Sequence, residues 1–197
     1  MAKDETKKTN GLAVFFPGIG YTCDRSLLYY TAIMMKELGY RIVPVPYTGF
    51  PRNVKGDAQK MRECYVIARN QATEILRDID FSEYNDIVFI GKSIGTTVAL
   101  AIAKQFDLTV RSVLYTPLVE TFDMLPEKPC DRAIAFHGTR DPWANTQEII
   151  AACEIRGIPL HLVENANHSL ETGDLDNDLH TLKETMRLVR KFFDDDR

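Results

Sequence analysis

Residues 85–104, NDIVFIGKSIGTTVALAIAK, contain the pattern that decides the fold. The segment begins with DIVFI, an apolar run typical of a buried strand, and ends with TTVALAIAK, which has the composition of a buried helix. Between them stands GKSIG, which fits two kinds of chemistry. It contains the Gly-Lys-Ser of a phosphate-binding loop, and it also matches the Gly-x-Ser-x-Gly turn that exposes a nucleophilic serine.

The residues before this pentapeptide exclude the phosphate-binding loop. Such a loop requires Gly-x-x-x-x-Gly-Lys-Ser/Thr, because several backbone N–H groups must wrap around the phosphates. Asp86 stands where the first glycine belongs, and residues 87–90 are part of the strand. The sequence therefore predicts a strained turn at Ser93, with Lys92 projecting sideways as an incidental residue. A simple helix cap at Ser93 would not explain a glycine two positions to either side.

Apolar runs alternate with helix-like segments along the rest of the chain. Several runs are apolar at nearly every position, as in parallel strands that are covered on both faces. Helical periodicity is present at 61–79 and at 179–193. The sequence therefore predicts an α/β fold with a doubly wound, mostly parallel six-stranded sheet flanked by helices. The expected strands span residues 12–17, 41–47, 86–90, 112–118, 133–138 and 159–164.

Two further polar residues follow strands of this predicted sheet. Asp141 comes just after the strand at 133–138, and His168 comes just after the strand at 159–164. A serine nucleophile needs a base that accepts its proton, and the base needs a carboxylate that fixes its tautomer. Because the carboxyl ends of parallel strands meet at one edge of a sheet, Ser93, Asp141 and His168 are expected to lie together.

Each of these assignments has an alternative. Asp141 also suits a plain turn, since Asp-Pro often starts one, and the acid would then be Glu120 or Asp123. His168 competes with the other histidines of the chain, whose positions suit structural roles better. These are His137, His161 and His180.

At these residues the sequence resembles the α/β-hydrolase superfamily. The resemblance covers nearly the whole chain, from FFPGIG at 15–20 to the last helix. It implies that Ser93 is the nucleophile, His168 the base and Asp141 the acid that orients the base. It implies no cofactor.

The loop after the first strand completes the resemblance. Enzymes of the superfamily carry a His-Gly-x-Gly loop here, and its backbone N–H stabilises the oxyanion that forms during acyl transfer. The resemblance implies that the donors of this chain are Ile19 and Ile94, the residue after the expected nucleophile. Pro17 stands in place of the histidine. This difference leaves a backbone N–H donor in the loop, but the donor could be the residue before or after Ile19. A dinucleotide-binding turn would need a third glycine, which GIGYTC lacks.

Composition limits the functions that remain. The 197 residues predict a single domain at 11–197 after a flexible polar tail at 1–10. No signal or membrane-spanning run is present, so the expected location is cytoplasmic with no membrane partner. A net charge of -4 without a basic block argues against nucleic acid. The four scattered cysteines fit reduced thiols better than a disulfide framework or a metal site.

The substrate is expected to be a small carboxylic ester or thioester, cleaved through an acyl-enzyme. Residues 119–132 are too few for the helical lid of many α/β-hydrolases, so the site should be open and shallow. The expected substrate-binding residues are Tyr21, Phe50 and Trp143, and further walls are expected from Tyr47, Leu118, Phe122 and Met124. A peptidase or amidase, or a binding protein that keeps the fold without turnover, are the alternatives. The oligomeric state is open.

Overall fold

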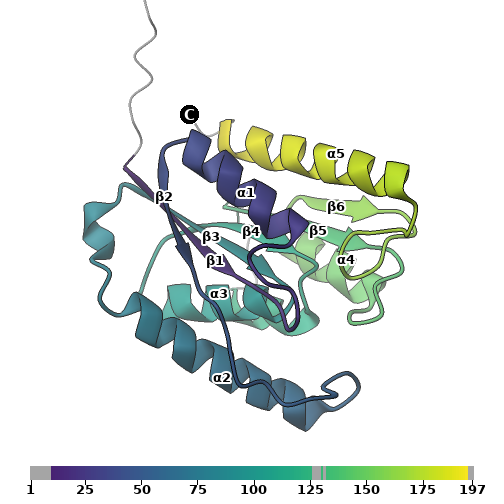
Figure 1. Ribbon diagram of the computed structural model, residues 1–197, viewed down its shortest axis with the longest axis horizontal. Coiled ribbons are helices and arrows are strands. Elements are labelled where there is room, and N and C mark those ends of the chain that lie inside the picture. Colours follow the sequence, from purple (N-terminus) through teal and green to yellow (C-terminus); the bar gives the residue numbers. More distant parts are fainter. Residues whose placement is uncertain (1–9, 126–129, 131, 195–197) are drawn as a thin grey trace, which may run out of the picture.

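The computed structural model describes residues 10–125, 130 and 132–194, whose strands form a six-stranded sheet (Figure 1). The strands are β1 (Gly11–Phe16), β2 (Tyr40–Pro44), β3 (Asp86–Lys92), β4 (Arg111–Tyr115), β5 (Ala133–Gly138) and β6 (Leu160–Val163). Their order is β2-β1-β3-β4-β5-β6, and every neighbouring pair is parallel. The predicted fold class is therefore confirmed.

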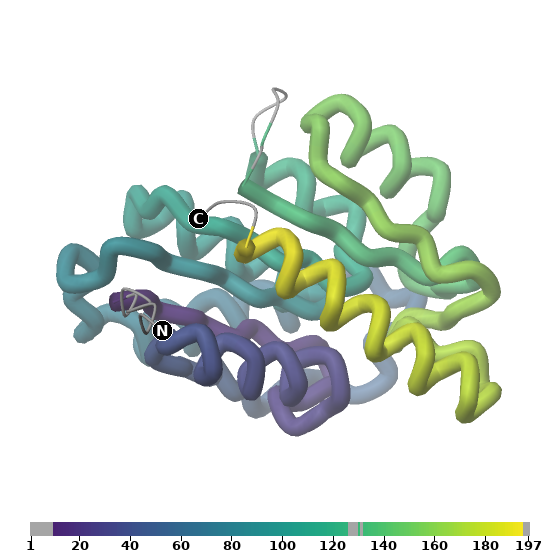
Figure 2. Tube along the Cα trace, turned by 90° about the horizontal axis from the view of Figure 1, so that it is seen from above, coloured from purple at the N-terminus to yellow at the C-terminus, as the bar shows by residue number. Residues whose placement is uncertain are grey.

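Helices cover both faces of the sheet, as the views in Figure 1 and Figure 2 show. In β1, Ala13 and Phe15 face one pair of helices, α1 (Ser26–Glu37) and α5 (Leu175–Asp194), whereas Leu12, Val14 and Phe16 face α2 (Ala58–Leu76) and α3 (Ile94–Gln105). Because both faces are covered, the strand is apolar at every position. The helices are α1 (Ser26–Glu37), α2 (Ala58–Leu76), α3 (Ile94–Gln105), α4 (Thr146–Ile155) and α5 (Leu175–Asp194), and the short 3-10 helices are η1 (Phe81–Glu83) and η2 (Val119–Met124).

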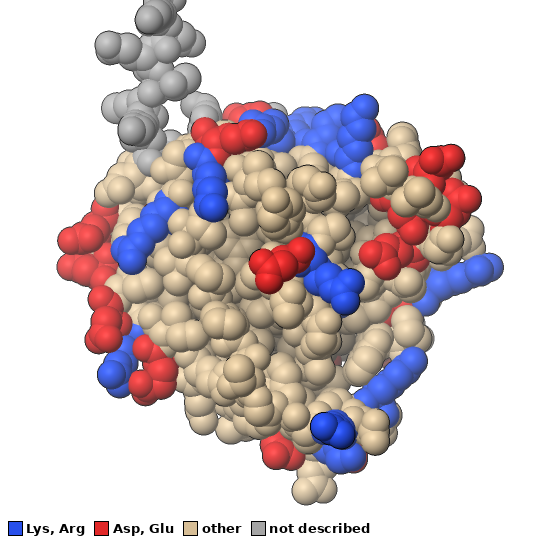
Figure 3. Space-filling view, viewed as in Figure 1, with Lys and Arg blue, Asp and Glu red and all other residues tan. Residues whose placement is uncertain are grey.

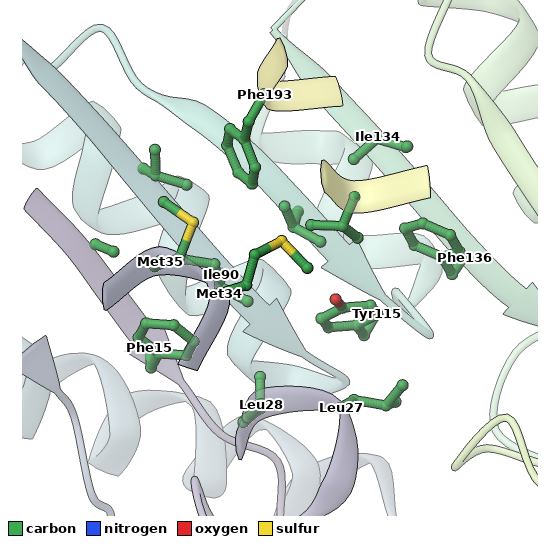
Figure 4. Close-up of a cluster of buried hydrophobic side chains, with 14 of the residues drawn as sticks. Phe15, Leu27, Leu28, Met34, Met35, Ile90, Tyr115, Ile134, Phe136 and Phe193 are labelled. Atoms are coloured by element: carbon green, nitrogen blue, oxygen red, sulfur yellow. The ribbon is translucent and has the colours of Figure 1, made fainter. Parts of the chain in front are cut away.

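Figure 4 shows the core on the α1 and α5 side, where methionines of α1 lie among aromatic rings. Tyr115 of β4 is fully buried there, and its hydroxyl group hydrogen-bonds Thr31 of α1 over 2.8 Å. Burial of one such large side chain stabilises a fold by roughly 1.5–3 kcal/mol. The backbone of Tyr115 also supports the turn at Ser93, described below, so this core holds the functional edge in place.

Two strands end earlier than the sequence predicts, because prolines follow. β2 ends at Pro44 rather than at residue 47, since neither Pro44 nor Pro46 can donate a ladder hydrogen bond. β4 ends at Tyr115 rather than at residue 118, because Thr116 has a φ of 43° and Pro117 follows it. The other strands lie where predicted to within about two residues.

The predicted tail falls almost wholly on residues 1–9, which lie outside the described residues. In the described part of the chain, no helix has both the length and the apolar character needed to cross a membrane. Acidic and basic side chains are interspersed on the face seen in Figure 3.

Candidate active site

Ser93 stands at the sharp turn between β3 and α3. Its φ of 57° and ψ of -128° lie in a region that residues with a Cβ rarely adopt. A Cβ on Gly91 would lie 2.6 Å from the Cα atom of Thr96, and a Cβ on Gly95 would lie 2.5 Å from the carbonyl oxygen of Pro17. Strand and helix therefore approach too closely for a larger residue at either glycine, as the sequence predicts.

Hydrogen bonds of the Ser93 backbone fix this turn, and they do not involve the hydroxyl group of Ser93. The N–H of Ser93 donates to the carbonyl oxygen of Tyr115 (3.0 Å), and the carbonyl oxygen of Ser93 accepts from the N–H and the hydroxyl group of Thr96 (2.9 and 2.6 Å). The hydroxyl group of Ser93 makes no capping bond to α3. A capping role for Ser93 is therefore excluded.

Two short hydrogen bonds join the residues that the sequence singles out. The hydroxyl oxygen of Ser93 lies 2.7 Å from Nε2 of His168, and Nδ1 of His168 lies 2.6 Å from Oδ2 of Asp141. The other carboxylate oxygen of Asp141 accepts from the N–H of Trp143 over 2.8 Å. With a proton on Nδ1, the neutral imidazole presents Nε2 as an acceptor for the serine hydroxyl group.

The loops that carry His168 and Asp141 are locked together by their backbones. The N–H of Arg140 donates to the carbonyl oxygen of Ala166 over 2.9 Å. A Cβ on Gly138, at the end of β5, would lie 2.6 Å from the carbonyl oxygen of Asn167. The loop that carries Asp141 can therefore lie directly against the loop that carries His168, because β5 ends at a glycine.

Burial keeps the histidines at this edge in the neutral form. The pKa of His168 is lowered from its ordinary value chiefly by burial, while its hydrogen bond to Asp141 acts in the opposite direction. The cations Lys92 and Lys55 lower the pKa of His168 further. The side chain of Asp141 is fully buried, with both oxygens occupied as described above. Such a site favours neutral His168 at neutral pH.

The two residues that the sequence predicts as oxyanion donors, Ile19 and Ile94, lie on either side of Ser93 in the fold, one in the turn after β1 and one at the start of α3. Gly18 and Tyr21 form an antiparallel bridge, which leaves Ile19 and Gly20 at the tip of a tight turn, and Gly20 has a φ of 70°. The turn lies against Ser93, since a Cβ on Gly18 would lie 3.2 Å from the Cβ of that serine. Among the described residues, the N–H groups of Ile19 and Ile94 have no hydrogen-bond acceptor. Both are therefore available to a ligand.

An open pocket of about 320 Å³ begins at Ile94, the residue after Ser93. Its apolar wall comes from α2, from the residue after Ser93 and from the η2 region, and includes Met61, Tyr65, Ile94, Leu118 and Met124. Charged side chains also line it: Arg62, Glu120 and Asp123. Glu120 and Asp123, the alternative candidates for the acid, thus line this pocket. His168 is hydrogen-bonded to Asp141 instead.

The predicted substrate-binding aromatics separate into two groups. Phe50 and Trp143 pack in a small apolar cluster with Ile94 and Leu118, and the centre of the Trp143 ring lies 5.7 Å from that of the His168 ring. Tyr21 lies instead in the core on the α1 and α5 side, and its hydroxyl oxygen accepts from the N–H of Leu27 (3.1 Å). None of the three lines the 320 Å³ pocket.

The pocket residues from α2 were missed as functional residues. Met61 and Tyr65 belong to the helical stripe of α2 that the sequence assigns to the core. A period of three and four residues gives no sign of which turn of a helix faces a ligand. Of the other predicted walls, Phe122 is buried in the core, and Tyr47 packs on Phe50.

Lys92 is not the sideways, incidental residue that the sequence suggests. It is only 3% exposed, and its ammonium group lies 4.9 Å from the centre of the Tyr21 ring. Burial lowers the pKa of Lys92 to about 7, against the opposing influence of Asp141 and Glu171. Because strand residues alternate, Lys92 points to the same face as Ile90, into the α1 and α5 side.

The remaining histidines have structural surroundings. His137 is buried behind the acid, with Nε2 hydrogen-bonded to Thr146 (3.1 Å) and Nδ1 3.7 Å from Asp141. Its pKa is lowered by burial. His161 stacks on Phe136 with ring centres 5.2 Å apart, and His180 is exposed on α5. In the described part of the chain, no group of three or more potential ligands could hold a metal ion.

Comparison with solved structures identifies the class of fold. A protein assigned to the α/β superfamily of hydrolases, from Xanthomonas campestris pv. campestris, shares 17% identity over 93% of this chain and 99% of its own, with a TM-score of 0.61. An α/β serine hydrolase homologue from Coxiella burnetii shares 18% over 92% and 85%, with a TM-score of 0.62. A serine hydrolase without a lid, from Xanthomonas campestris, shares 14% over 94% and 84%, with a TM-score of 0.56.

The chain therefore has the α/β-hydrolase fold, and the resemblance seen in its motifs is confirmed at that level. No protein-family model and no curated protein matches the sequence. What the protein does must be argued from its own side chains.

Proposed function

We propose that the protein is a serine hydrolase that cleaves a small carboxylic ester or thioester through an acyl-enzyme intermediate. The observation that carries the proposal is the unbroken chain of two hydrogen bonds from Ser93 through His168 to Asp141, of 2.7 and 2.6 Å. A structural serine needs neither a strained turn nor a histidine held in one tautomer by a buried carboxylate.

The chemistry follows from these positions. Ser93 Oγ attacks the carbonyl carbon of the substrate while its proton passes to Nε2 of His168, and Asp141 stays ionised and stabilises the imidazolium. The negative charge on the carbonyl oxygen is met by the N–H groups of Ile19 and Ile94. When the bond to the leaving oxygen or sulfur breaks, His168 gives its proton to that atom. A water molecule then hydrolyses the acyl-enzyme by the same steps.

The pocket favours a small uncharged acyl group. Its wall beside Ser93 is apolar, and the two carboxylates, Glu120 and Asp123, stand against one cation, Arg62. A negatively charged acyl chain would therefore meet net repulsion there. An uncharged aliphatic or aromatic acyl group would gain from burial against Met61 and Leu118.

Labelling with a fluorophosphonate probe tests the proposal. Wild-type protein should gain one probe mass at Ser93, and Ser93→Ala should gain none, because a serine without a neighbouring base does not react. Ser82→Ala, which removes an exposed serine of η1, serves as the matched control and should label like wild type. Equal labelling of wild type and Ser93→Ala, or no labelling of folded wild type, would reject a serine hydrolase and leave a binding protein.

A further inference from the structure

Lys92 is a buried cation beside the candidate nucleophile that the acyl-enzyme chemistry does not use. A Cβ on Gly18 would lie 3.2 Å from both the Cδ atom of Lys92 and the Cβ of Ser93, so the lysine stem runs directly beside the serine. The residue is 3% exposed. Within the described part of the chain its ammonium group makes no hydrogen bond and no ion pair, and it packs on the Tyr21 ring.

A plain packing role does not account for this side chain. Methionine or leucine would fill the same space without the cost of removing a charge from water, which a cation–aromatic contact offsets only in part. Ionisable groups whose pKa is strongly shifted by burial are concentrated at functional sites, where their charge acts on a reacting group.

The geometry of the site identifies that group as His168, because Nε2 of His168 lies 2.7 Å from the hydroxyl oxygen of Ser93 and the stem of Lys92 runs beside the same serine. Asp141 and Glu171 favour the protonated lysine, and protonated Lys92 in turn disfavours a proton on His168. Tyr21 contributes a neutral phenol, because burial raises its pKa. Lys55 also acts on His168, but it lies at the exposed mouth, 5.8 Å from the ring of Trp143. Dissolved salt screens the interaction of the exposed Lys55 with His168, and it screens that of the buried Lys92 much less.

We propose that Lys92 is a positioning residue: its ammonium group, held against Tyr21 beside Ser93, adds to burial in holding His168 in the neutral form that can accept the serine proton. The role rests on the proposed function. The titrations of His168 and Lys92 are then coupled. As the pH rises, His168 loses its proton first, and Lys92 loses its proton near pH 7. The lysine extends the range of neutral His168 into mildly acidic solution.

Proton NMR of the imidazole Cε1–H groups tests this without any substrate. The chain has four histidines, so the spectrum is simple, and His168→Gln assigns the signal. In Lys92→Met the midpoint of the His168 titration should move to higher pH than in wild type, and the fraction of neutral His168 at pH 5.5 should fall about three- to tenfold. The shift should persist in about 0.5 M salt. Lys104→Met removes an exposed cation from the far end of α3 and should leave the midpoint unchanged.

An unchanged His168 midpoint in folded Lys92→Met would overturn the proposal, and so would a shift of the same size in Lys104→Met. If Lys92→Met does not fold, Lys92→Gln takes its place. The wild-type curve gives a further measurement, since the His168 signal should show a second inflection near pH 7, and a single inflection would contradict the coupling. The fluorophosphonate labelling tests the proposed hydrolase activity separately, so a negative result there is distinguishable from an unchanged His168 midpoint.

Discussion

At the scale of single residues, the charge of Lys92 has a consequence for stability as well as for His168. Its pKa is about 7 in the folded protein and 10.5 in an unfolded chain. Below pH 7 both states hold the proton, and this group adds no pH dependence. Between pH 7 and 10.5 the unfolded chain holds more protons, so the free energy of unfolding rises with pH. Protonated Lys92 therefore destabilises the fold.

We expect Lys92→Met to be more stable than wild type at pH 6 by on the order of a few kcal/mol, and this advantage should shrink as the pH rises from 7 to 9. Urea unfolding of both proteins at pH 6 and pH 9 measures the difference. Lys104→Met, which removes an exposed charge, should change stability by less than about 0.5 kcal/mol at either pH. A stability gain of equal size at the two pH values would show that only packing, and not the charge, changed.

The sequence predicts the polar residues of the site better than their surroundings. Ser93, Asp141 and His168 each follow a separate strand, and the rule that parallel strands end at one edge brings them together. The burial of Lys92 could not be predicted in the same way. It depends on Gly18 and Tyr21 folding back over the end of β3, a tertiary contact with no local signal in GKSIG.

At the scale of elements, the turn between β3 and α3 depends on a close approach to β1. The space that a Cβ on Gly95 would occupy is already filled by the carbonyl oxygens of Phe16 and Pro17. The glycine therefore lets the N-terminus of α3 touch the end of β1, and this contact brings the Gly18 turn beside Ser93.

Gly95→Ala should lower the free energy of unfolding by more than about 3 kcal/mol, because backbone has to move to admit the methyl group. Gly20→Ala is the matched control. Gly20 also has a constrained backbone, with a φ of 70°, but a Cβ there would have no heavy atom within 4 Å. Its cost should be about 1 kcal/mol. Equal losses in thermal or urea unfolding would mean that the β1 contact is not what excludes a side chain at Gly95.

Element boundaries were predicted less well than element order. Apolar runs predict all six strands in sequence, but β2 and β4 end early at prolines and at the positive φ of Thr116. The predicted aromatic walls divide for a related reason. Tyr21 lies on a loop whose turn between Gly18 and Tyr21 sends the ring into the core, and no periodicity in a loop reveals such a direction.

At the scale of the whole molecule, the sheet places Ser93, Asp141 and His168 on loops that follow β3, β5 and β6 (Figure 1). η2 ends at Met124 and β5 begins at Ala133, and many hydrolases of this fold insert a lid at this position of the chain. Residues of α2 and of the η2 region line the pocket beside Ile94, and the proposed function would place the acyl chain of a substrate against them.

The size of that pocket predicts which acyl chains the protein prefers. Its volume of about 320 Å³ lies at the lower end of the range for small-molecule sites, roughly 300–1,000 Å³. Each buried methylene contributes about 0.8 kcal/mol, so kcat/KM should rise about fourfold per carbon until the pocket is full. A longer chain would leave apolar surface exposed to water and gain nothing further. We therefore expect a maximum between about two and six carbons in a series of p-nitrophenyl esters from acetyl to palmitoyl.

Leu118 gives this expectation a second test, because its side chain lines the pocket next to the nucleophile. Leu118→Ala should move the maximum to longer chains and Leu118→Trp to shorter ones, since the first variant deepens the pocket and the second fills it. Leu179→Ala, which truncates a leucine that is 57% exposed on α5, should leave the maximum in place. The wild-type maximum could instead lie at dodecanoyl or longer and stay there in both Leu118 variants. This result would show that the acyl chain binds elsewhere, because the pocket is too small to bury a twelfth carbon.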